Sequence, residues 1–320
     1  MKYFKNLFLL LTGIYIIYFA SHILIENIDG FSLINASISS STLVVAFLTY
    51  LVSHALRVLR LVILSAEPSI SIKNLWTAQL KANGVNLIVP FKMGEAYRLI
   101  AFKKFFGSYS KSFSILLCER FLDIALITLL LILSFYISNL EVELLTNLIF
   151  LSVFVLFLIL FFYYSFDEFL VLINRIFVGK KSTLINLRII KASSSLLNIL
   201  KDTKSILSSK ILSCLSITLL IWTFEIAVFY LLLGNLMLDG FIYIFLAASV
   251  ALSSLLPNGP AGYGGIQLAF YLVGTSVGFE DLILYSFIYN LYIFGSAIAV
   301  AGLLFVLEFF KSIYKTTYAR

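Results

Sequence analysis

Charged residues are scarce in this chain of 320 residues. Asp, Glu, Lys and Arg make up 12% of it, whereas soluble globular proteins carry about 25%. The hydrophobic share is 61%, and several uncharged apolar runs reach the roughly 20 residues that a helix needs to cross a bilayer. This composition excludes an ordinary water-soluble fold and predicts an all-α integral membrane protein.

Cysteine and histidine are scarce too. The two cysteines, Cys118 and Cys214, lie far apart in separate apolar runs, which argues against a disulfide framework and against a metal site. The two histidines, His22 and His54, are too few for a histidine-rich metal centre. In a membrane protein, a net charge of +7 reports topology more often than nucleic-acid binding. We therefore expect no metal, no cofactor and no nucleic-acid partner.

Six apolar segments are long enough to be full transmembrane helices. Two shorter ones, residues 75–90 and 241–257, each stop at a proline. At about 1.5 Å per residue, each covers only about 20–25 Å of a hydrocarbon core of about 30 Å, so we interpret both as arms of re-entrant helical hairpins. The six full spans are predicted at 6–24, 42–64, 112–138, 144–165, 211–235 and 282–308.

The distribution of charge gives this arrangement an orientation. Segments 25–41, 139–143, 236–240 and 276–281 hold seven acidic residues and no Lys or Arg. Every Lys and Arg except Arg120 falls on the opposite side, as the positive-inside rule predicts for a cytoplasmic face. We therefore expect a multi-pass protein of the cell inner membrane with both termini in the cytoplasm. The first apolar stretch is expected to stay as an anchor rather than be removed as a signal peptide.

The order of the segments repeats with the opposite orientation. Residues 1–140 contain two spans, an inner hairpin and a span, and residues 141–320 contain two spans, an outer hairpin and a span. Gly/Pro-interrupted segments at matching places of an inverted repeat point to a transport site, here a polar cavity between the halves of a single domain. Cytoplasmic residues 166–210 mix apolar and basic residues at helical spacing, which favours interfacial helices on an anionic leaflet. A simple connector is the alternative.

The break after the first short arm carries charges at helical spacing. Pro90 ends the arm, and Gly94 permits a close turn. Lys92, Glu95 and Arg98 follow at intervals of three residues, so that neighbours share a helix face. Cations that flank exposed amides, with an acid to orient them, suit an anionic headgroup. The alternative is a basic juxtamembrane segment that only fixes topology.

A second group of charges lies inside the third predicted span. Placing a charge there costs at least about 2.5–3.5 kcal/mol. Arg120 and Asp123 can form an ion pair at a spacing of three residues. The remaining charge, on Glu119, then needs a partner from outside the helix, for which we expect Lys92 or Arg98. An internal ion pair that only locks helix packing is the alternative.

Glu225 is the most isolated acid in the chain and lies near the predicted membrane midplane. Intramembrane acids are proton or substrate sites by default, and a protonated acid bonded to a neighbouring helix is the equal alternative. His54 occupies roughly the matching place in the first half. Arg57 and Arg60, one and two turns further on, are expected to snorkel to the inner headgroups.

A third group lies in residues 251–272, which read ALSSLLPNGPAGYGGIQLAFYL. Its prolines stop the incoming arm, and its glycines allow positive φ and close approach to a ligand. The next helix is expected to begin near Ile266, where free N–H groups would favour an anion. No Gly-Lys-Ser/Thr of a nucleotide-binding loop follows, and helix packing is the alternative role of the glycines. The residues concerned are Pro257, Pro260, Gly262, Gly264 and Gly265.

These stretches resemble the lysylphosphatidylglycerol synthase transmembrane-region family, the flippase-like domain also found in multiple peptide resistance factors. Residues 86–98 match the family's Asn, Pro, basic, Gly-Glu and Arg pattern, and residues 119–123 match its Glu-Arg-x-x-Asp element. Residues 256–267 match its Pro-Gly-Gly-x-Gly-x-x-Glu element, except that Gln267 replaces the Glu, which puts a proton-coupled role of that position in doubt. Lys92 stands where Arg is usual and lacks the bidentate fork.

The resemblance implies lipid translocation without lipid synthesis, because 320 residues leave no room for the soluble aminoacyl-transferase domain of the fused members. We therefore hypothesise a flippase-like transporter that moves or accommodates an anionic or glycan-bearing lipid. The expected headgroup-binding residues are Asn86, Lys92, Arg98, Arg120, Gly262, Gly264 and Gly265. The polar residues expected to pair with these cations or to couple movement to an ion are Glu95, Glu119, Asp123, Glu225 and Gln267.

Two other classes of function stay open. One is a membrane-embedded glycosyl or acyl transferase that uses a lipid-linked donor, although no catalytic triad, metal cluster or nucleotide loop is visible in the sequence. The other is a non-transporting scaffold for envelope-assembly enzymes. Membrane lipids are the expected partners in each case, with biosynthetic enzymes added under the scaffold hypothesis, and the oligomeric state stays open.

Overall fold

The computed structural model describes residues 38–65, 70–88, 94–138, 143–179, 183–236, 238–254, 262, 264–279 and 281–318. Within these ranges every regular element is a helix and no strand occurs, which confirms the predicted all-α class. The first predicted span, at 6–24, lies outside the described residues. So do four of the predicted site residues, Pro90, Lys92, Pro257 and Pro260.

Four of the described helices are long and apolar enough to cross a bilayer: α3 (Ser40–Ser65), α6 (Tyr109–Ser138), α9 (Leu184–Leu233) and α12 (Leu282–Tyr318). The pair α7 (Glu143–Tyr164) and α8 (Phe166–Val178) is bent by 57° and gives at most a fifth span. The chain is therefore a multi-pass membrane protein. The spans predicted from residue 42 onward coincide with α3, α6, α7, α9 and α12, and the total of six stays a prediction.

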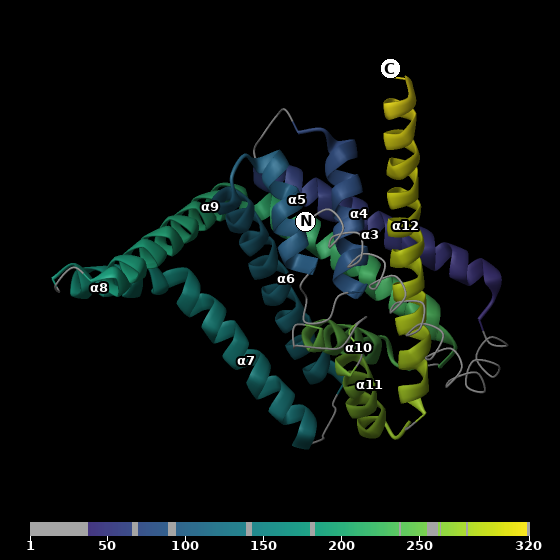
Figure 1. The fold of residues 1–320 in the computed structure, drawn as a ribbon. Helices are drawn as coiled ribbons and strands as arrows, with labels where there is room; N and C mark the ends of the chain where they lie inside the picture. The colour runs from purple at the N-terminus through teal and green to yellow at the C-terminus, as the bar shows by residue number, and fades with distance from the viewer. Residues whose placement is uncertain are drawn as a thin grey trace.

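Two pairs of short helices interrupt the long ones. The first pair is α4 (Ile72–Ile88) and α5 (Gly94–Phe106), and the second is α10 (Gly240–Ser253) and α11 (Gly265–Ser276). The two predicted short arms are α4 and α10, which end close to the expected breaks. Figure 1 shows α4 and α5 in the upper half of the body and α10 and α11 in its lower half.

Glycines allow two close contacts around α4. A Cβ atom on Gly94, the first residue of α5, would lie 2.2 Å from the Cα of Asn86, so only glycine permits the tight return of the chain predicted there. A Cβ atom on Gly84 would lie 2.4 Å from the Cβ of Ala301, which brings α4 very close to α12.

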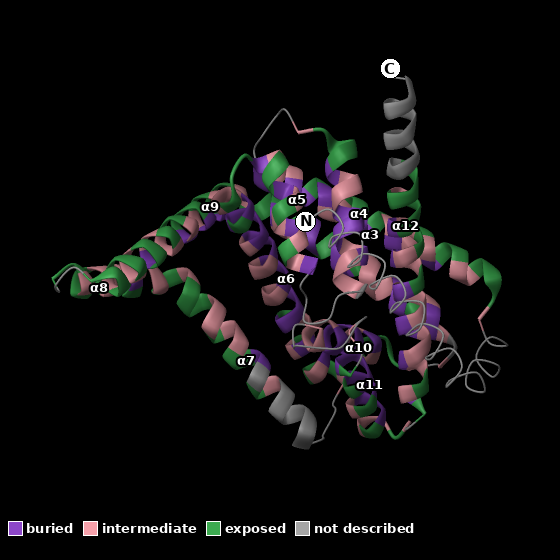
Figure 2. Ribbon diagram, viewed as in Figure 1, coloured by how far each residue is buried: buried purple, intermediate pink, exposed green. Residues whose placement is uncertain are grey.

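The helices of the two halves pack across each other. Helix α3 lies along α9, α4 packs against α12, and α10 packs against α6. Each pair of short helices therefore contacts a long helix of the other half. Buried residues gather in this body, whereas α8 and the start of α9 are mostly exposed or partly exposed (Figure 2).

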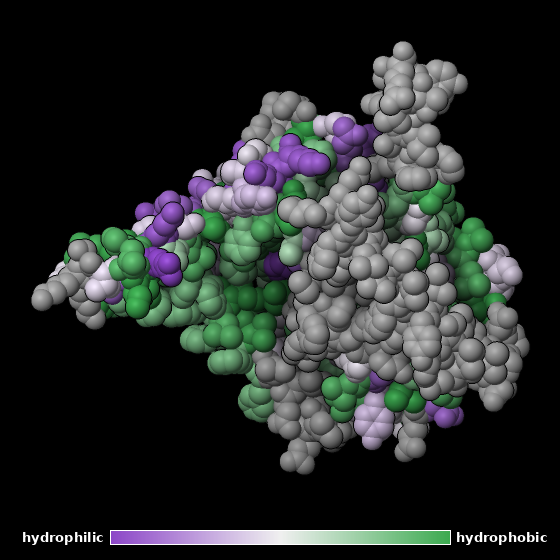
Figure 3. Space-filling model, in the orientation of Figure 1, coloured by the Kyte–Doolittle hydropathy of each residue, from purple (hydrophilic) through white to green (hydrophobic). Residues whose placement is uncertain are grey.

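Helix α8 and residues 184–210 of α9 form a helix pair that we call the arm; α9 packs on α6 at residues 199–207, and the rest of the arm projects from the body (Figure 1). Lys204 and Asp167 tie its two segments together by an ion pair of 2.8 Å, and Ser193 donates a hydrogen bond to Asn174. Figure 3 shows hydrophilic residues along one edge of the arm and hydrophobic residues below them. An amphipathic arm of this kind is typical of a helix pair at a membrane surface.

Candidate functional site

Arg60 of α3 is completely buried, with an exposed fraction of 0%. Its Nη1 donates to Asp123 Oδ1 at 2.7 Å and to Thr218 Oγ1 at 2.9 Å. Its Nη2 donates to Glu119 Oε1 at 2.8 Å and to Asp123 Oδ2 at 2.9 Å. The expectation that Arg60 snorkels to the lipid headgroups is wrong, because α6 and α9 supply four acceptor atoms inside the body.

Glu225 of α9 is not isolated either. It accepts a hydrogen bond from Arg57 Nη2 at 3.0 Å and one from Ser53 Oγ at 2.8 Å. Arg57 also lies 3.8 Å from Asp123. The predicted snorkelling of Arg57 is therefore wrong for the same reason, and the second half of the chain contributes one acid to a group centred on the first half.

Arg98 and Arg120 share one carboxylate, that of Glu95. Arg120 Nη2 donates to Glu95 Oε1 at 2.7 Å, and Arg98 Nη1 lies 3.6 Å from Glu95 Oε2. Arg98 Nη2 also donates to Glu119, which confirms the predicted partner from the first hairpin. The predicted pairing of Arg120 with Asp123 is wrong, because Arg120 reaches α5 whereas Asp123 faces α3.

These ion pairs form one chain of alternating charge, which we call the charge chain. Its members contribute four positive and four negative charges, so that the whole is neutral. Its inner side chains are at most 5% exposed from Arg60 to Arg98, whereas those of Glu95 and Arg120 are 34% and 36% exposed. The order is Glu225, Arg57, Asp123, Arg60, Glu119, Arg98, Glu95 and Arg120.

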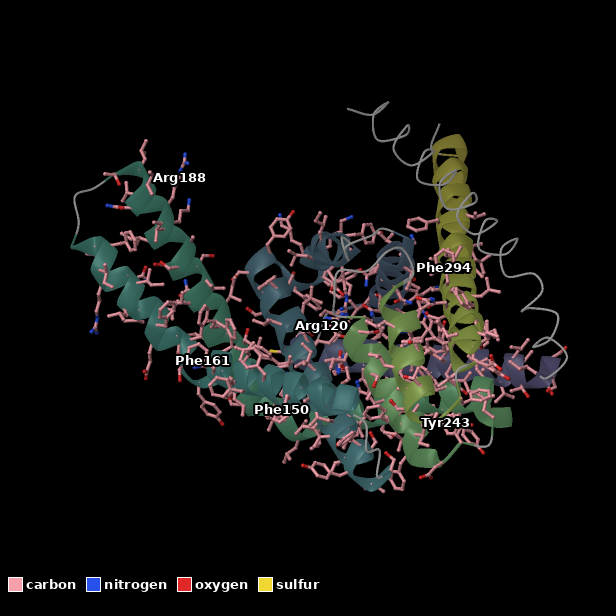
Figure 4. The ribbon with its side chains drawn as sticks, turned by 90° about the horizontal axis from the view of Figure 1, so that it is seen from below. Arg120, Phe150, Phe161, Arg188, Tyr243 and Phe294 are labelled. Carbon is pink, nitrogen blue, oxygen red and sulfur yellow. The ribbon has the colours of Figure 1, made fainter. Side chains whose placement is uncertain are left out.

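A cavity of about 260 Å³ lies along the charge chain. The cavity is lined by residues of α3, α4, α5 and α6 from the first half of the sequence and by residues of α9, α10, α11 and α12 from the second half. Figure 4 shows Arg120 within the body among these helices, whereas Arg188 lies out on the arm. The predicted cavity with polar residues in its lining is thus present, and its place between two inverted halves stays a prediction. The lining residues that the sequence singled out are His54, Arg57, Asn86, Gly94, Glu95, Arg98, Glu119, Arg120, Asp123, Glu225 and Gly262.

Uncharged polar residues form another part of the cavity wall. Asn83 Nδ2 of α4 donates to the Tyr50 hydroxyl at 2.6 Å and to His54 Nε2 at 3.1 Å. The rings of Tyr50 and His54 meet edge to face with centroids 4.3 Å apart. Asn86 follows on α4, and Asn290 of α12 lines the same cavity.

The glycine-rich break supplies a different local structure. Gly262 and Gly264 have positive φ angles of 77° and 97°, which confirms the expected need for glycine there. Helix α11 begins at Gly265, one residue before the predicted start. Gln267 Oε1 accepts a hydrogen bond from the Gly264 N–H at 2.8 Å. Gln267 therefore occupies one of the amides that an anion was expected to meet, and among these residues Gly262 alone lines the cavity.

The sequence pointed to Asn86 and His54 but not to Tyr50, Asn83 or Asn290. For α3, one signal in the sequence indicates the polar face. One face of this otherwise apolar helix carries Tyr50, Ser53, His54, Arg57 and Arg60, because each of them is three or four residues from another member of the set. Such a polar stripe marks the face of a transmembrane helix that is turned away from lipid. Among the described residues, no group of three or more His, Cys, Asp or Glu is placed to hold a metal ion.

Comparison with models of protein families matches residues 7–301 to the lysylphosphatidylglycerol synthase TM region. The chain belongs to this family. Membership makes it a membrane protein related to lipid modification or transport, and the match includes the whole charge chain and the cavity. No match was found among curated proteins or among solved structures.

Proposed function

We propose that this family member is a flippase-like transporter that moves or accommodates an anionic lipid headgroup across the cell inner membrane. The observation that carries the proposal is the sharing of Glu95 by Arg98 and Arg120 at the exposed end of the charge chain. A lipid phosphate can bind to Arg98 and Arg120, the same two cations that now surround the Glu95 carboxylate.

Exchange of Glu95 for a lipid phosphate keeps the charge chain neutral. A phosphodiester carries one negative charge, as the carboxylate does, and arginine binds both groups through paired N–H donors. The Glu95 and Arg120 side chains are about one third exposed, and ion pairs at exposed positions contribute only about 0–1 kcal/mol. The outer link can therefore open while the buried links around Arg60 stay closed.

The packing of the helices supports an inverted repeat with halves at 1–140 and 141–320. In such a repeat α4 and α5 correspond to α10 and α11, and α6 corresponds to α12. The contact of α4 with α12 then corresponds to the contact of α10 with α6. With the asymmetry of charge, this correspondence supports one domain with two re-entrant pairs and cytoplasmic termini.

The arm fits the cytoplasmic surface in this topology. Residues 166–210 carry eight Lys or Arg and three Asp or Glu. Within the same segment, α8 exposes apolar side chains, including Phe169, Leu172 and Ile176. A surface with both properties binds the headgroup layer of an anionic leaflet, which supports an interfacial position for the arm.

A scrambling assay tests the transport proposal. The protein is reconstituted in liposomes with fluorescent phosphatidylglycerol or a fluorescent polyprenyl phosphate, and a membrane-impermeant reductant then bleaches the outer leaflet. We expect wild type to expose the inner-leaflet label and the double variant Arg98→Gln, Arg120→Gln to protect it.

The matched control is Arg175→Gln, Lys204→Gln, which removes the same charge from the arm and should move lipid as wild type does. Equal rates for wild type and the Arg98, Arg120 double variant would contradict the proposed site.

A further inference from the structure

Four buried polar atoms of the cavity residues have no hydrogen-bond partner within the described part of the chain; one is Nε of the charged Arg57, and the other three belong to uncharged side chains. These three are His54 Nδ1 on α3, Asn86 Oδ1 on α4 and Asn290 Nδ2 on α12. His54 and Asn290 are 5% and 8% exposed. Buried polar groups in native proteins are nearly always paired, so atoms of this kind at a cavity indicate a group that binds there.

The hydrogen bonds around His54 define what these atoms offer. Asn83 Nδ2 can only donate, so His54 Nε2 accepts its hydrogen bond and the neutral ring carries its proton on Nδ1. His54 Nδ1 and Asn290 Nδ2 are therefore donors, and Asn86 Oδ1 is an acceptor. The set is uncharged and mixed.

This mixture selects among headgroup chemistries. A phosphate oxygen only accepts and leaves Asn86 unsatisfied, whereas an ammonium group only donates and leaves His54 and Asn290 unsatisfied. A hydroxyl group donates and accepts, so several hydroxyls on one small molecule satisfy all three atoms.

The uncharged atoms lie beside the charged ones on the same helices. His54 is one turn from Arg57 on α3, which is about 4.5 Å along the helix axis. Asn86 packs against Gly94, the residue before Glu95. A headgroup with its phosphate at the charge chain can therefore extend its neutral part toward these atoms.

We propose that the cavity contains a hydroxyl-binding subsite, formed by His54, Asn86 and Asn290, for the polyol or sugar part of a phospholipid headgroup. This inference rests on the proposed function, because the charge chain has to hold the phosphate. It narrows the substrate to lipids whose phosphodiester carries a neutral group with several hydroxyls.

Two short-chain lipids of equal charge test the subsite in the purified full-length protein. Dioctanoyl phosphatidylinositol carries a hydroxyl-rich headgroup, whereas dioctanoyl phosphatidylethanol ends in an ethyl group. We expect wild type to bind the inositol lipid at least about fivefold more tightly, since each net hydrogen bond changes affinity by about two- to tenfold. Asn86→Leu and Asn290→Leu should each reduce this preference, and Asn290→Leu should leave the affinity for phosphatidylethanol unchanged.

Thr128→Val is the matched control, because Thr128 also has a buried oxygen without a partner among the described residues but does not line the cavity. It should keep the wild-type preference. Equal binding of both lipids to wild type overturns the subsite, and water molecules then bind the uncharged polar atoms of the cavity. The proposed function itself fails if wild type binds neither lipid or if Arg120→Gln weakens neither.

The preference of the wild-type protein for phosphatidylinositol over phosphatidylethanol tests the subsite even where a variant does not fold. A thermal melt without lipid also separates binding from folding. Because Asn290 Nδ2 has no partner in the described structure, Asn290→Leu should melt at or above the wild-type temperature. A melting temperature that falls strongly, with the preference retained in Asn86→Leu, would assign these residues to folding and overturn the subsite.

Discussion

Replacement of Arg60 by methionine tests whether the charge chain acts as a unit. Arg60 makes four hydrogen bonds to Glu119, Asp123 and Thr218. Without it, four acids face three arginines, and the next cation of Asp123 is Arg57 at 3.8 Å. Removing one partner of a buried ion pair costs about 3–5 kcal/mol, because an uncompensated charge stays buried. We expect a loss of this size in the free energy of unfolding.

A second substitution separates charge balance from lost packing. The double variant Arg60→Met, Asp123→Leu restores neutrality, and apolar replacement of a buried ion pair is often neutral or stabilising. Thr218 keeps its bond to the Cys214 carbonyl at 2.7 Å. The Trp222 indole loses its bond of 3.3 Å to Asp123, which leaves a residual cost of about 1 kcal/mol. The double variant should therefore be more stable than Arg60→Met alone.

Unfolding in mixed detergent micelles, followed by circular dichroism, measures these changes. The control pair is Lys204 and Asp167, which lie 2.8 Å apart with about one quarter of each side chain exposed. Lys204→Met should cost about 0–1 kcal/mol. The reasoning is refuted if Arg60→Met costs no more than Lys204→Met, or if the double variant loses the sum of its single losses.

Three further predictions concern the outer link, the helix contacts and the topology. Glu95→Gln removes the acid that pairs with Arg120 and one of the two acids that pair with Arg98, so phosphatidylethanol should bind about two- to fivefold more tightly, whereas Glu168→Gln on the arm should bind it as wild type does. Gly94→Ala places a Cβ atom against the backbone of Asn86 and should cost about 1–3 kcal/mol in the same unfolding assay, whereas Gly295→Ala meets nothing within 4 Å and should be tolerated. Positions 108 and 281 are exposed, whereas the native Cys118 and Cys214 are buried. In the variants Ser108→Cys and Asp281→Cys, impermeant thiol reagents should therefore label position 281 from outside the cell and position 108 only after lysis. Labelling of both from outside would contradict the topology.

The helices were predictable because the bilayer imposes length and composition. An apolar run needs about 20 residues to cross, so the bounds of α3, α6 and α12 follow from where charge and loop residues interrupt the runs. The short arms α4 and α10 were predictable for a related reason, since a proline inside a helix breaks or kinks it and each arm ends before a proline. The pairing of Glu119 with a cation of the first hairpin, predicted as Lys92 or Arg98, also followed, because a charge in lipid has to find a counter-charge.

The inward direction of the Arg57 and Arg60 side chains was not predictable from their spacing alone. Both lie within two turns of the end of α3, where long basic side chains usually reach the headgroups. What decides their direction is the set of acceptors on α6 and α9, which the sequence places far away. Likewise, Arg120 and Asp123 have the spacing of an ion pair, yet each meets a partner from another helix. Tertiary contacts select among the pairings that local spacing permits.

A buried ionic network is a costly way to hold helices together, since apolar residues of similar volume often do so as well or better. In a membrane the cost of each unpaired charge is larger still, so stability alone gives no reason for four arginines and four acids. The gradient of burial along the charge chain supplies one. The links at Arg60 cannot open without stranding a charge, whereas the link between Glu95 and Arg120 is about one third exposed, lies beside the cavity and can exchange its anion. The effects of substitutions should therefore differ along the charge chain. Those at Arg60 and Asp123 should change the free energy of unfolding, and those at Glu95 and Arg120 should change lipid binding.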